Sequence, residues 1–507
     1  MNYNYSLIPF YAVIVSLVGA ILILISSRKP NLREFWTISA AIIKFILVFS
    51  LVPEFLKGNS VECEIISIAS GVSLAFRVDG LGLFFAIVAS GLWILTSFYS
   101  IGYMRGLSEH KQTRYFASFA IALSATMGVA FAANLVTFVF FYEILTISTY
   151  PLVIHKETPE AISAGRKYLA YTLSAGVILI IAIAWIFVLT GNVEFNANGI
   201  LKGVNISSAQ LTILFILLII GTGVKAAIIP LHSWLPTAMV APTPVSALLH
   251  AVAVVKAGVF GVLRIVVYVM GFDLLKTSGL WIILATFSAA TIVIASLIAF
   301  SQDNLKKRLA YSTIAHLSYI ILGASLLNGT ALLGGILHLA AHATLKITLF
   351  FVAGAIYVKT HIENISELDG IGYQMPLTMG AFAIGALGLA GIPPLNGFIS
   401  KFILINGTLS SAHSAIVLIY LLSGLLNAGY FFPIVYRAFF IKSERFTKIR
   451  EVSLFMLIPI LITAGLSLLL GLFPDLLFNL FHIAQNVSSE IGKSIIVDVN
   501  KISGAGL

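Results

Sequence analysis

Long apolar segments separated by short polar stretches run through the whole sequence. A membrane-spanning helix needs about 20 consecutive, mostly apolar residues, and fourteen segments of that kind can be read between polar or Pro/Gly-rich stretches. Their centres lie near residues 16, 45, 90, 122, 144, 177, 220, 256, 288, 316, 344, 390, 425 and 462. The pattern predicts an all-α polytopic membrane protein with about 14 transmembrane helices. We expect the tail over 474–507 to be amphipathic and to lie along the membrane surface through Leu476, Leu477, Leu480 and Phe481.

The composition removes several classes of function. Of the 507 residues, 59% are hydrophobic and only 10% charged, where soluble domains carry about 25% charge, so a soluble enzyme is excluded. The single cysteine, Cys63, excludes a disulfide framework, a thiolate iron–sulfur site and a zinc site built on several cysteines. No nucleotide, dinucleotide, flavin or metal motif is present. We therefore expect no catalytic chemistry, cofactor or metal in this chain alone.

The net charge of +10 would suggest a nucleic-acid partner in a soluble protein. Here it has another source, because loops after odd-numbered predicted helices hold eighteen of the thirty Lys and Arg, while loops after even-numbered helices and the tail hold six. Cytoplasmic loops carry the basic excess. The sequence predicts a multi-pass protein of the cell (plasma) membrane with both termini on the outer side and no nucleic-acid partner. The N-terminus lacks the basic region of a cleavable signal peptide, so we expect the first apolar segment to be retained.

Charged residues inside the predicted spans are the main functional signal. A charge at mid-membrane costs roughly 2.5–3.5 kcal/mol and usually faces a protein interior or a wet cavity. Glu143 is the clear carboxylate within a span, and a Glu/Lys pair that moves apart can switch protonation near neutral pH; a structural ion pair is the alternative. We leave Lys44 off the path, and we expect Arg264 to snorkel towards the interface. The basic residues within spans are Lys44, Lys225, Lys256, Arg264, Lys346 and Lys401.

Histidines add groups that exchange protons near neutral pH. His338, His342 and Lys346 recur every four residues, so they share one helix face with about 6 Å of rise between neighbours. Water could bridge those gaps, and His250 and His316 supply similar groups on other spans. The alternatives are hydrogen bonds that only pack helices, and a metal site, which the lack of nearby carboxylates and cysteines disfavours.

Two predicted spans are interrupted by proline. Each proline removes a backbone donor and frees a carbonyl, which is tolerated at membrane depth only where protein or a water-filled cavity satisfies it. We therefore expect hydrated breaks beside lysines, with simple packing kinks as the alternative. The breaks are at Pro230 and Pro236, which follow Lys225, and at Pro393 and Pro394, which precede Lys401.

Similar spacings suggest that two halves of the chain are related. Lys225 and Lys401 are 176 positions apart, and the pairs Glu143/His316 and Arg264/Arg437 are each 173 apart. If each half has five helices, the second is inverted in the membrane, as is typical of transporters. The predicted organisation is an N-terminal three-helix segment (1–112), a first repeat (113–270), a second repeat (277–440), and a last helix with the amphipathic tail (441–507).

These motifs together resemble the antiporter-like membrane subunits of respiratory complex I, Mrp-type cation/proton antiporters and membrane-bound energy-converting hydrogenases. The resemblance covers roughly residues 75–440 and is closer to the Mrp and hydrogenase types, because some complex I subunits carry Glu where this chain has Lys401. The motifs are Val78-Asp79-Gly80-Leu81, Tyr142-Glu143, Lys225 through His232-Ser233-Trp234-Leu235-Pro236 to Ala241-Pro242-Thr243-Pro244-Val245-Ser246, His250 with Lys256, Leu309-Ala310-Tyr311-Ser312 with His316, the His338/His342/Lys346 series, and Gly391-Ile392-Pro393-Pro394 to Lys401.

The resemblance implies a proton path along the membrane mid-plane. Glu143 would pair with Lys225, Lys256 and Lys346 would be central, and Lys401 would end the path, with the four histidines as relay. It also implies partners: other membrane subunits, lipids, and a peripheral redox module that holds any iron–sulfur, nickel–iron or flavin cofactor.

The predicted function is an ion-translocating subunit of a respiratory or energy-converting complex, moving protons with Na⁺ as an open alternative. Two other readings stay open. An autonomous Na⁺/H⁺ antiporter would need several oxygen ligands for the cation, and a passive membrane anchor for a redox module would need none of the lysines for transport.

Overall fold

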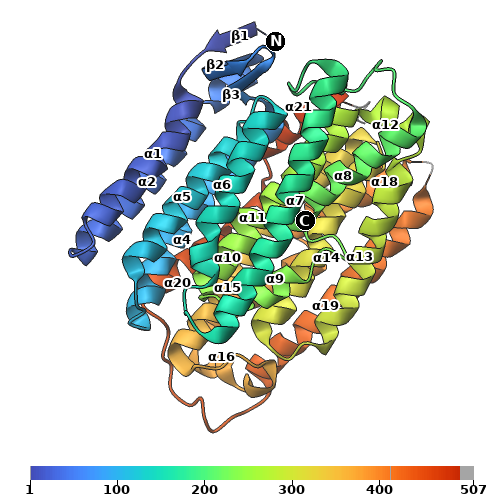
Figure 1. The fold of residues 1–507 in the computed structure, drawn as a ribbon. Helices are drawn as coiled ribbons and strands as arrows, with labels where there is room; N and C mark the ends of the chain where they lie inside the picture. The colour runs from blue at the N-terminus through green and yellow to red at the C-terminus, as the bar shows by residue number, and fades with distance from the viewer. Residues whose placement is uncertain (1, 412, 492–507) are drawn as a thin grey trace. The chain divides into compact units, whose positions relative to one another are not determined.

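The computed structural model describes residues 2–411 and 413–491. The chain forms two compact units. Unit 1 comprises Met1–Ser97 and Glu109–Leu284, and unit 2 comprises Phe98–Ser108 and Ala285–Leu507. The divisions fall inside two long helices, α4 (Gly80–Gly106) and α13 (Trp281–Ser301). Figure 1 labels the three strands and most of the α-helices.

Unit 1 consists of antiparallel helices with a small sheet. Besides parts of α4 and α13, its elements are β1 (Asn2–Tyr5), α1 (Ile8–Ile25), α2 (Pro30–Phe49), α3 (Val52–Leu56), β2 (Asn59–Ala69), β3 (Val72–Val78), α5 (Gln112–Ala130), α6 (Leu135–Val153), α7 (Pro159–Thr190), α8 (Ser208–Ala226), α9 (Trp234–Thr237), η1 (Ala238–Val240), α10 (Thr243–Ala247), η2 (Leu248–Val252), α11 (Val254–Arg264), η3 (Ile265–Met270) and α12 (Phe272–Ser278).

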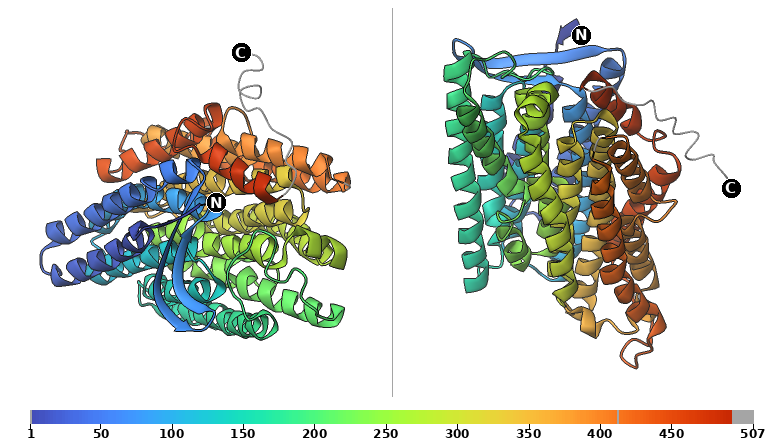
Figure 2. Two further views of the ribbon diagram at one scale, coloured as in Figure 1. Left: turned by 90° about the horizontal axis from the view of Figure 1, so that it is seen from above. Right: turned by 90° about the vertical axis from the view of Figure 1, so that its right-hand side faces the viewer.

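The sheet departs from the expected all-α fold. β1 pairs in parallel with β2, and β2 pairs antiparallel with β3, and in Figure 2 the strands lie across the ends of neighbouring helices of unit 1. Along β2, Val61 and Cys63 are buried while Glu64 is exposed, which is the two-residue alternation of a half-buried strand. The expectation is therefore correct for most of the chain and wrong for the strands in residues 2–5 and 59–78.

A single buried rod of helix lies at the centre of unit 1. The segment Thr243–Met270, made of α10, η2, α11 and η3, is buried along its whole length, as is typical of a helix that is apolar on all sides. Two π-helical turns, η2 and η3, interrupt its regular hydrogen bonding. Such turns occur frequently at functional sites.

Unit 2 is organised around α15 (Gly329–Thr360), which packs against α14, α17, α18, α20 and α21 and is buried along its whole length. The other elements of unit 2 are α14 (Leu305–Ser325), η4 (Ile365–Glu367), α16 (Ile371–Gln374), α17 (Pro376–Ala390), α18 (Asn396–Leu409), η5 (Ser414–Ile416), α19 (Val417–Phe440), α20 (Leu454–Leu472) and α21 (Leu480–Ile491).

The helices agree with a multi-pass membrane protein. Among the described residues, eleven helical segments are long and apolar enough to cross a membrane. The other predicted centres, near 122, 316 and 390, fall in α5, α14 and α17, of which α17 is a shorter apolar helix. The count of fourteen spans and the inverted repeats with their boundaries stay predictions.

The proline segments lie between helices. Pro230 is in the irregular stretch after α8, and Pro236 is inside α9, a single turn within the same interruption. Pro393 and Pro394 lie between the end of α17 and the start of α18. Both interruptions follow a helix that ends on a residue in the left-handed region, Ala227 or Gly391.

The expected surface position of the tail is wrong for two residues. Leu480 and Phe481 are only 6% and 4% exposed, because α21 packs against α15. Leu476 is exposed, in agreement with the expectation. Residues 492–507 of the predicted tail lie outside the described residues.

Candidate functional site

Unit 1 brings Glu143 on α6 and Lys225 at the end of α8 together. Lys225 Nζ lies 3.7 Å from Glu143 Oε1, with Lys225 fully buried and the Glu143 side chain 20% exposed. The ammonium also donates a hydrogen bond to the backbone oxygen of Tyr142 and lies 3.3 Å from the centre of its ring, a cation–π contact. The ammonium of Lys225 therefore has two separate partners, the Glu143 carboxylate and the Tyr142 carbonyl. If the ion pair with Glu143 separates, the ammonium keeps its hydrogen bond to Tyr142.

Gly176 on α7 makes room for the Glu143 carboxylate. A Cβ at this position would lie 2.5 Å from the carboxylate carbon, well inside van der Waals contact. On the other side of the pair, a Cβ at Gly258 of α11 would lie 2.2 Å from the backbone nitrogen of Ala226. The two glycines therefore let neighbouring helices approach the Glu143/Lys225 pair closely.

Lys256 and His250 lie on the central rod of unit 1, and both are fully buried. His250 is inside the π-helical turn η2, and Lys256 follows in the first turn of α11. Between them Ala253 has φ −117° and ψ −75°, so the helix changes its hydrogen bonding between the two groups. The sequence singled out both residues, but it gave no signal for the π turn.

In unit 2 the histidines form a hydrogen-bonded chain across four helices. His316 Nδ1 on α14 lies 3.0 Å from His338 Nε2 on α15, and His338 Nδ1 lies 2.9 Å from Ser400 Oγ on α18. His316 Nε2 lies 3.1 Å from Asn427 Oδ1 on α19, which also accepts a hydrogen bond from Tyr430. Sequence analysis missed Ser400, Asn427 and Tyr430. The available signal was Asn427, the one asparagine of α19, which lies in a mostly apolar stretch of that helix.

The hydrogen bonds between these side chains have a preferred direction of donation. The Asn427 oxygen can only accept, so His316 donates from Nε2 and accepts at Nδ1 when it is neutral. His338 then donates from Nε2, and its Nδ1 can accept from the Ser400 hydroxyl. The single proton of that hydroxyl can instead go to the backbone oxygen of Gly397, 3.1 Å away. If His338 gains a proton at Nδ1, it can pass its Nε2 proton to His316 Nδ1, which is how an imidazole relays a proton. His316 then holds the proton as an imidazolium, and the Asn427 oxygen accepts its Nε2–H without taking the proton.

Helix α14 contributes as much to this network as α15 does. The rings of His338 and His342 lie with their centroids 5.2 Å and 5.6 Å from the His316 ring. Lys346 Nζ donates to Ser312 Oγ at 2.8 Å and to the backbone oxygen of Leu309 at 3.1 Å, both on α14. The predicted series along α15 is therefore present, but groups of α14 connect its members.

Lys401 reaches back across the break between α17 and α18. Its Nζ donates hydrogen bonds to the backbone oxygens of Leu389 and Ala390, at 2.5 Å and 3.2 Å. These are the last carbonyls of α17, which have no partner within the helix. Gly391 has φ +92°, and a Cβ there would lie 2.9 Å from Lys401 Cδ, so glycine fits both the backbone and the lysine.

Arg264 does not snorkel, and that expectation is wrong. Its side chain is 1% exposed and pairs with Asp79, with Nη2 3.1 Å from Asp79 Oδ1. The guanidinium also lies 4.8 Å from the ring centres of Phe260 and Tyr268. Asp79 in turn accepts a hydrogen bond from the backbone of Gly82 in the first turn of α4. The pair ties the end of the central rod to the start of α4.

Removing one member of this buried pair should destabilise unit 1. We expect Asp79→Ala to lower the free energy of unfolding by about 3–5 kcal/mol, because it leaves the Arg264 charge buried and unpaired. Thermal unfolding of the purified protein in detergent measures the change. Asp273→Ala is the matched control, since Asp273 is 87% exposed and pairs with Lys202 at 3.5 Å, and such pairs contribute at most about 1 kcal/mol. Equal shifts for both variants would contradict a stabilising role of the Asp79/Arg264 pair.

Lys44 on α2 is fully buried, and its Nζ lies 4.7 Å from the centre of the Trp93 ring. The contact is a cation–π interaction within the N-terminal part of unit 1. This contact is remote from the Glu143/Lys225 pair in the part of the chain that the structure describes, so Lys44 stays outside the candidate site.

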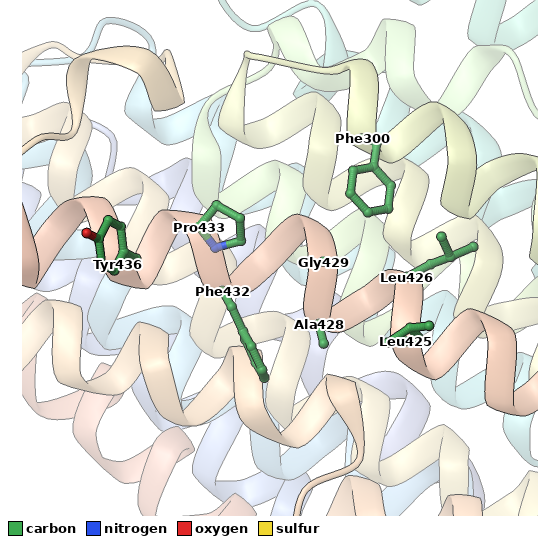
Figure 3. A pocket seen from close by; sticks show the side chains of 8 residues that line it. All are labelled: Phe300, Leu425, Leu426, Ala428, Gly429, Phe432, Pro433 and Tyr436. Carbon is green, nitrogen blue, oxygen red and sulfur yellow. The ribbon is translucent and has the colours of Figure 1, made fainter.

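An apolar hollow of about 610 Å³ lies on α19 and the end of α13 in unit 2. Its lining includes Phe300, Phe432, Pro433 and Tyr436, and Figure 3 shows the Phe300 ring facing the bare backbone of Gly429. Tyr436 is its single titratable lining residue. The hollow therefore offers an apolar surface, suited to a hydrocarbon chain, and no site for an ion.

Comparison with known proteins identifies the family. The transmembrane family described as NADH:quinone oxidoreductase/Mrp antiporter matches residues 132–427, more than half of the chain. The chain belongs to this family. A second family, described as the N-terminus of chain 5 of NADH-ubiquinone oxidoreductase (complex I), matches residues 66–116. The resemblance read from the motifs is confirmed.

Curated relatives include both branches of the family. NADH-quinone oxidoreductase subunit N of Desulforudis audaxviator is 31% identical over 417 residues, covering 78% of this chain and 83% of the relative. Na⁺/H⁺ antiporter subunit A1 of Staphylococcus aureus is 31% identical over 524 residues, covering 96% of this chain. This chain spans only 64% of the length of that antiporter subunit.

Two solved structures share the fold. A chain of the Mrp complex from Dietzia sp. DQ12-45-1b superposes with a TM-score of 0.84 at 21% identity, covering 96% of this chain and 99% of the other. A chain of the membrane-bound sulfane sulfur reductase, an archaeal respiratory membrane complex, also gives 0.84, at 23% identity with 96% and 100% covered. This likeness establishes a multi-pass membrane fold.

Proposed function

We propose that this chain is a proton-translocating, antiporter-like subunit of a multisubunit membrane complex. The observation that carries the proposal is the Glu143/Lys225 pair, which holds opposite charges 3.7 Å apart within two membrane-spanning helices. The family, and relatives named as subunits of an Na⁺/H⁺ antiporter and of an NADH-quinone oxidoreductase, support it. Both solved neighbours belong to multisubunit membrane complexes.

In unit 1 the proposed path runs from Glu143 through Lys225 to Lys256, with His250 as relay. At an effective dielectric constant of about 20, unit charges 3.7 Å apart attract by about 4 kcal/mol. Protonation of Glu143 removes that attraction and would change the proton affinity of Lys225 by roughly a thousandfold. Lys225 can then release its proton towards the central rod, and the lone pair of Lys256 can accept it.

In unit 2 the proposed path uses Lys346, the histidine relay and Lys401. Each ammonium has neutral oxygen partners: Ser312 and a carbonyl for Lys346, and two carbonyls for Lys401. These partners solvate the charge without fixing it as a carboxylate would. The lysines can therefore lose and regain a proton as neighbouring charges change.

Partners are part of the proposal. Phe140 and Ile147 are 50% and 63% exposed on the face of α6 that also exposes part of Glu143. A carboxylate is costly against lipid, which favours another membrane subunit over this face. We further propose that a peripheral redox module drives transport and holds any iron–sulfur, nickel–iron or flavin cofactor, and that lipids cover the remaining apolar faces.

We place both termini on the outer side of the cell (plasma) membrane. Within unit 1, Arg33 donates to Gln112, and Lys111 pairs with Glu157, so three basic loops meet at one end of the helices. Such loops face the cytoplasm. The opposite end of these helices carries the sheet, which includes β1 next to the N-terminus, and this end then lies outside.

The name of the Staphylococcus relative favours one variant of this function, the exchange of Na⁺ for protons by the complex. A jump in external Na⁺ applied to proteoliposomes of the purified complex tests it. Internal alkalinisation that depends on Na⁺ supports exchange, because protons must leave as Na⁺ enters, and internal acidification or no change in pH argues against it. Transport by the purified chain alone would instead identify an autonomous antiporter. Mild-detergent purification and identification of the co-purifying subunits establish whether the complex exists.

Gly176→Ala provides a test that leaves every charge in place. We expect it to reduce proton transport by about tenfold, because the added methyl group displaces the Glu143 carboxylate, and misplaced groups lose much of their reactivity. Transport by reconstituted complex measures this. Gly465→Ala on α20 is the control, since a Cβ there meets nothing within 4 Å. Wild-type transport by Gly176→Ala would argue against a positioned carboxylate.

A further inference from the structure

A cluster of metal-ligating side chains lies in two loops of unit 1. Glu109 and His110 precede α5, and His155 follows α6. One ligand atom from each lies within 4.8 Å of the others. Glu109 Oε2 is 3.8 Å from His110 Nδ1 and 3.7 Å from His155 Nε2. Two imidazole nitrogens thus approach the same carboxylate oxygen.

His155 points to a ligand because its ring is buried without a hydrogen bond. Its side chain is 0% exposed, and neither ring nitrogen has a hydrogen-bond partner among the described residues. Buried polar atoms nearly always have a hydrogen-bond partner, so a buried imidazole without one needs an explanation. A metal ion bound at Nε2, the nitrogen that faces Glu109, would supply a partner for this ring.

The charged side chains around the cluster balance one another. Lys111 and Arg114 both pair with Glu157. Glu157 offsets one of these two positive charges, and Glu109, which faces the imidazoles, offsets the other. Glu157 Oε2 also lies 3.9 Å from His110 Nε2. A carboxylate behind a histidine commonly orients the ring so that its other nitrogen meets a metal.

We propose that Glu109, His110 and His155 bind a divalent transition-metal ion of the Zn²⁺ type. Two imidazole nitrogens and one carboxylate oxygen, with water in a fourth position, form a donor set that Zn²⁺ takes, whereas Ca²⁺ and Mg²⁺ prefer oxygen ligands. Bonds of about 2.0–2.1 Å require ligand atoms roughly 3.3 Å apart, so the cluster must contract. The side chain of His110 is exposed and its ring can tilt to allow this. A bound ion would tie the loop before α5 to the loop after α6, the helix that carries Glu143.

The test is metal binding by the full chain in its purified complex, stripped with chelator and titrated with Zn²⁺ alone. We expect one Zn²⁺ per chain beyond any bound by other subunits. Glu109→Gln and His110→Ala, two loop variants with little effect on packing, should each weaken this binding at least about tenfold. His482→Ala is the matched control, because His482 is exposed and outside the cluster. Co²⁺ in place of Zn²⁺ should give the visible absorption of a four-coordinate site in wild type and lose it in both variants.

Two results would overturn the site. One is a wild-type complex that shows no saturable Zn²⁺ binding, or none stronger than that of the Glu109→Gln complex. The other is weaker binding in His482→Ala and in the two cluster variants alike, which would indicate general surface binding. Because the measurement is binding and absorption, it is independent of whether the chain transports protons.

Discussion

Glu143→Gln is expected to reduce proton translocation by the intact complex roughly a hundredfold or more. Glutamine keeps the size of the side chain and can still contact Lys225, but it can neither carry the charge nor exchange a proton. Positioned acid–base groups contribute about 10² to 10⁴-fold to proton transfer. Lys225 would keep its hydrogen bond to the backbone of Tyr142, and the protein would keep its fold. The loss should therefore appear in transport and not in stability. Acidification of inverted membrane vesicles, followed with a pH-sensitive dye, measures it.

The control for this variant is Glu64→Gln on β2, an exposed glutamate outside the pair. It should transport like wild type. Co-purification of the other subunits must be unchanged in both variants, so that a loss is assigned to the path and not to assembly. Transport by Glu143→Gln at the wild-type rate, in an assembled complex, would leave only a structural role for the ion pair.

His316→Gln is expected to have a comparable effect in unit 2. An amide can replace one hydrogen bond of His316, to Asn427 or to His338, but it cannot accept a proton at one atom while releasing another. Proton transfer between His338 and His316 would then be interrupted. We expect transport to fall roughly a hundredfold with little change in the thermal midpoint. Proton flux into proteoliposomes measures the effect.

His482→Gln serves as the control for this second variant, since it makes the same chemical change at an exposed histidine. His338→Gln should resemble His316→Gln, and the double variant should be no worse than either single one, because both remove one relay. Additive losses would mean that the two histidines act separately. Normal flux in both single variants would restrict the histidines to helix packing.

The sequence predicted the parts of the site that depend on local chemistry. A charge such as Glu143 or Lys225 inside an apolar segment is visible without a structure, because its cost in the membrane requires a reason. The interruption before Lys401 was visible for the same kind of reason, since prolines cannot continue a helix. The His338/His342/Lys346 series followed from the helical repeat alone.

What the sequence did not predict depends on contacts between distant residues. Arg264 is close to a predicted helix end, and only the position of Asp79, 185 residues earlier, shows that it is paired and buried. The π turn at His250 comes from packing around the central rod and has no pattern of its own. The sheet of residues 59–78 was missed because a short alternating segment between long apolar ones was read as a polar loop. The partners of the histidines lie on α18 and α19, which no spacing connects to α14.

The measurement that tests the central claim most directly is proton flux by the purified intact complex in proteoliposomes, compared between wild type and Lys225→Ala. The account predicts that Lys225→Ala abolishes flux while the subunit composition of the complex stays the same. Without Lys225, protonation of Glu143 has no neighbouring ammonium from which it can cause a proton to be released. Flux at the wild-type rate in an assembled Lys225→Ala complex would contradict it.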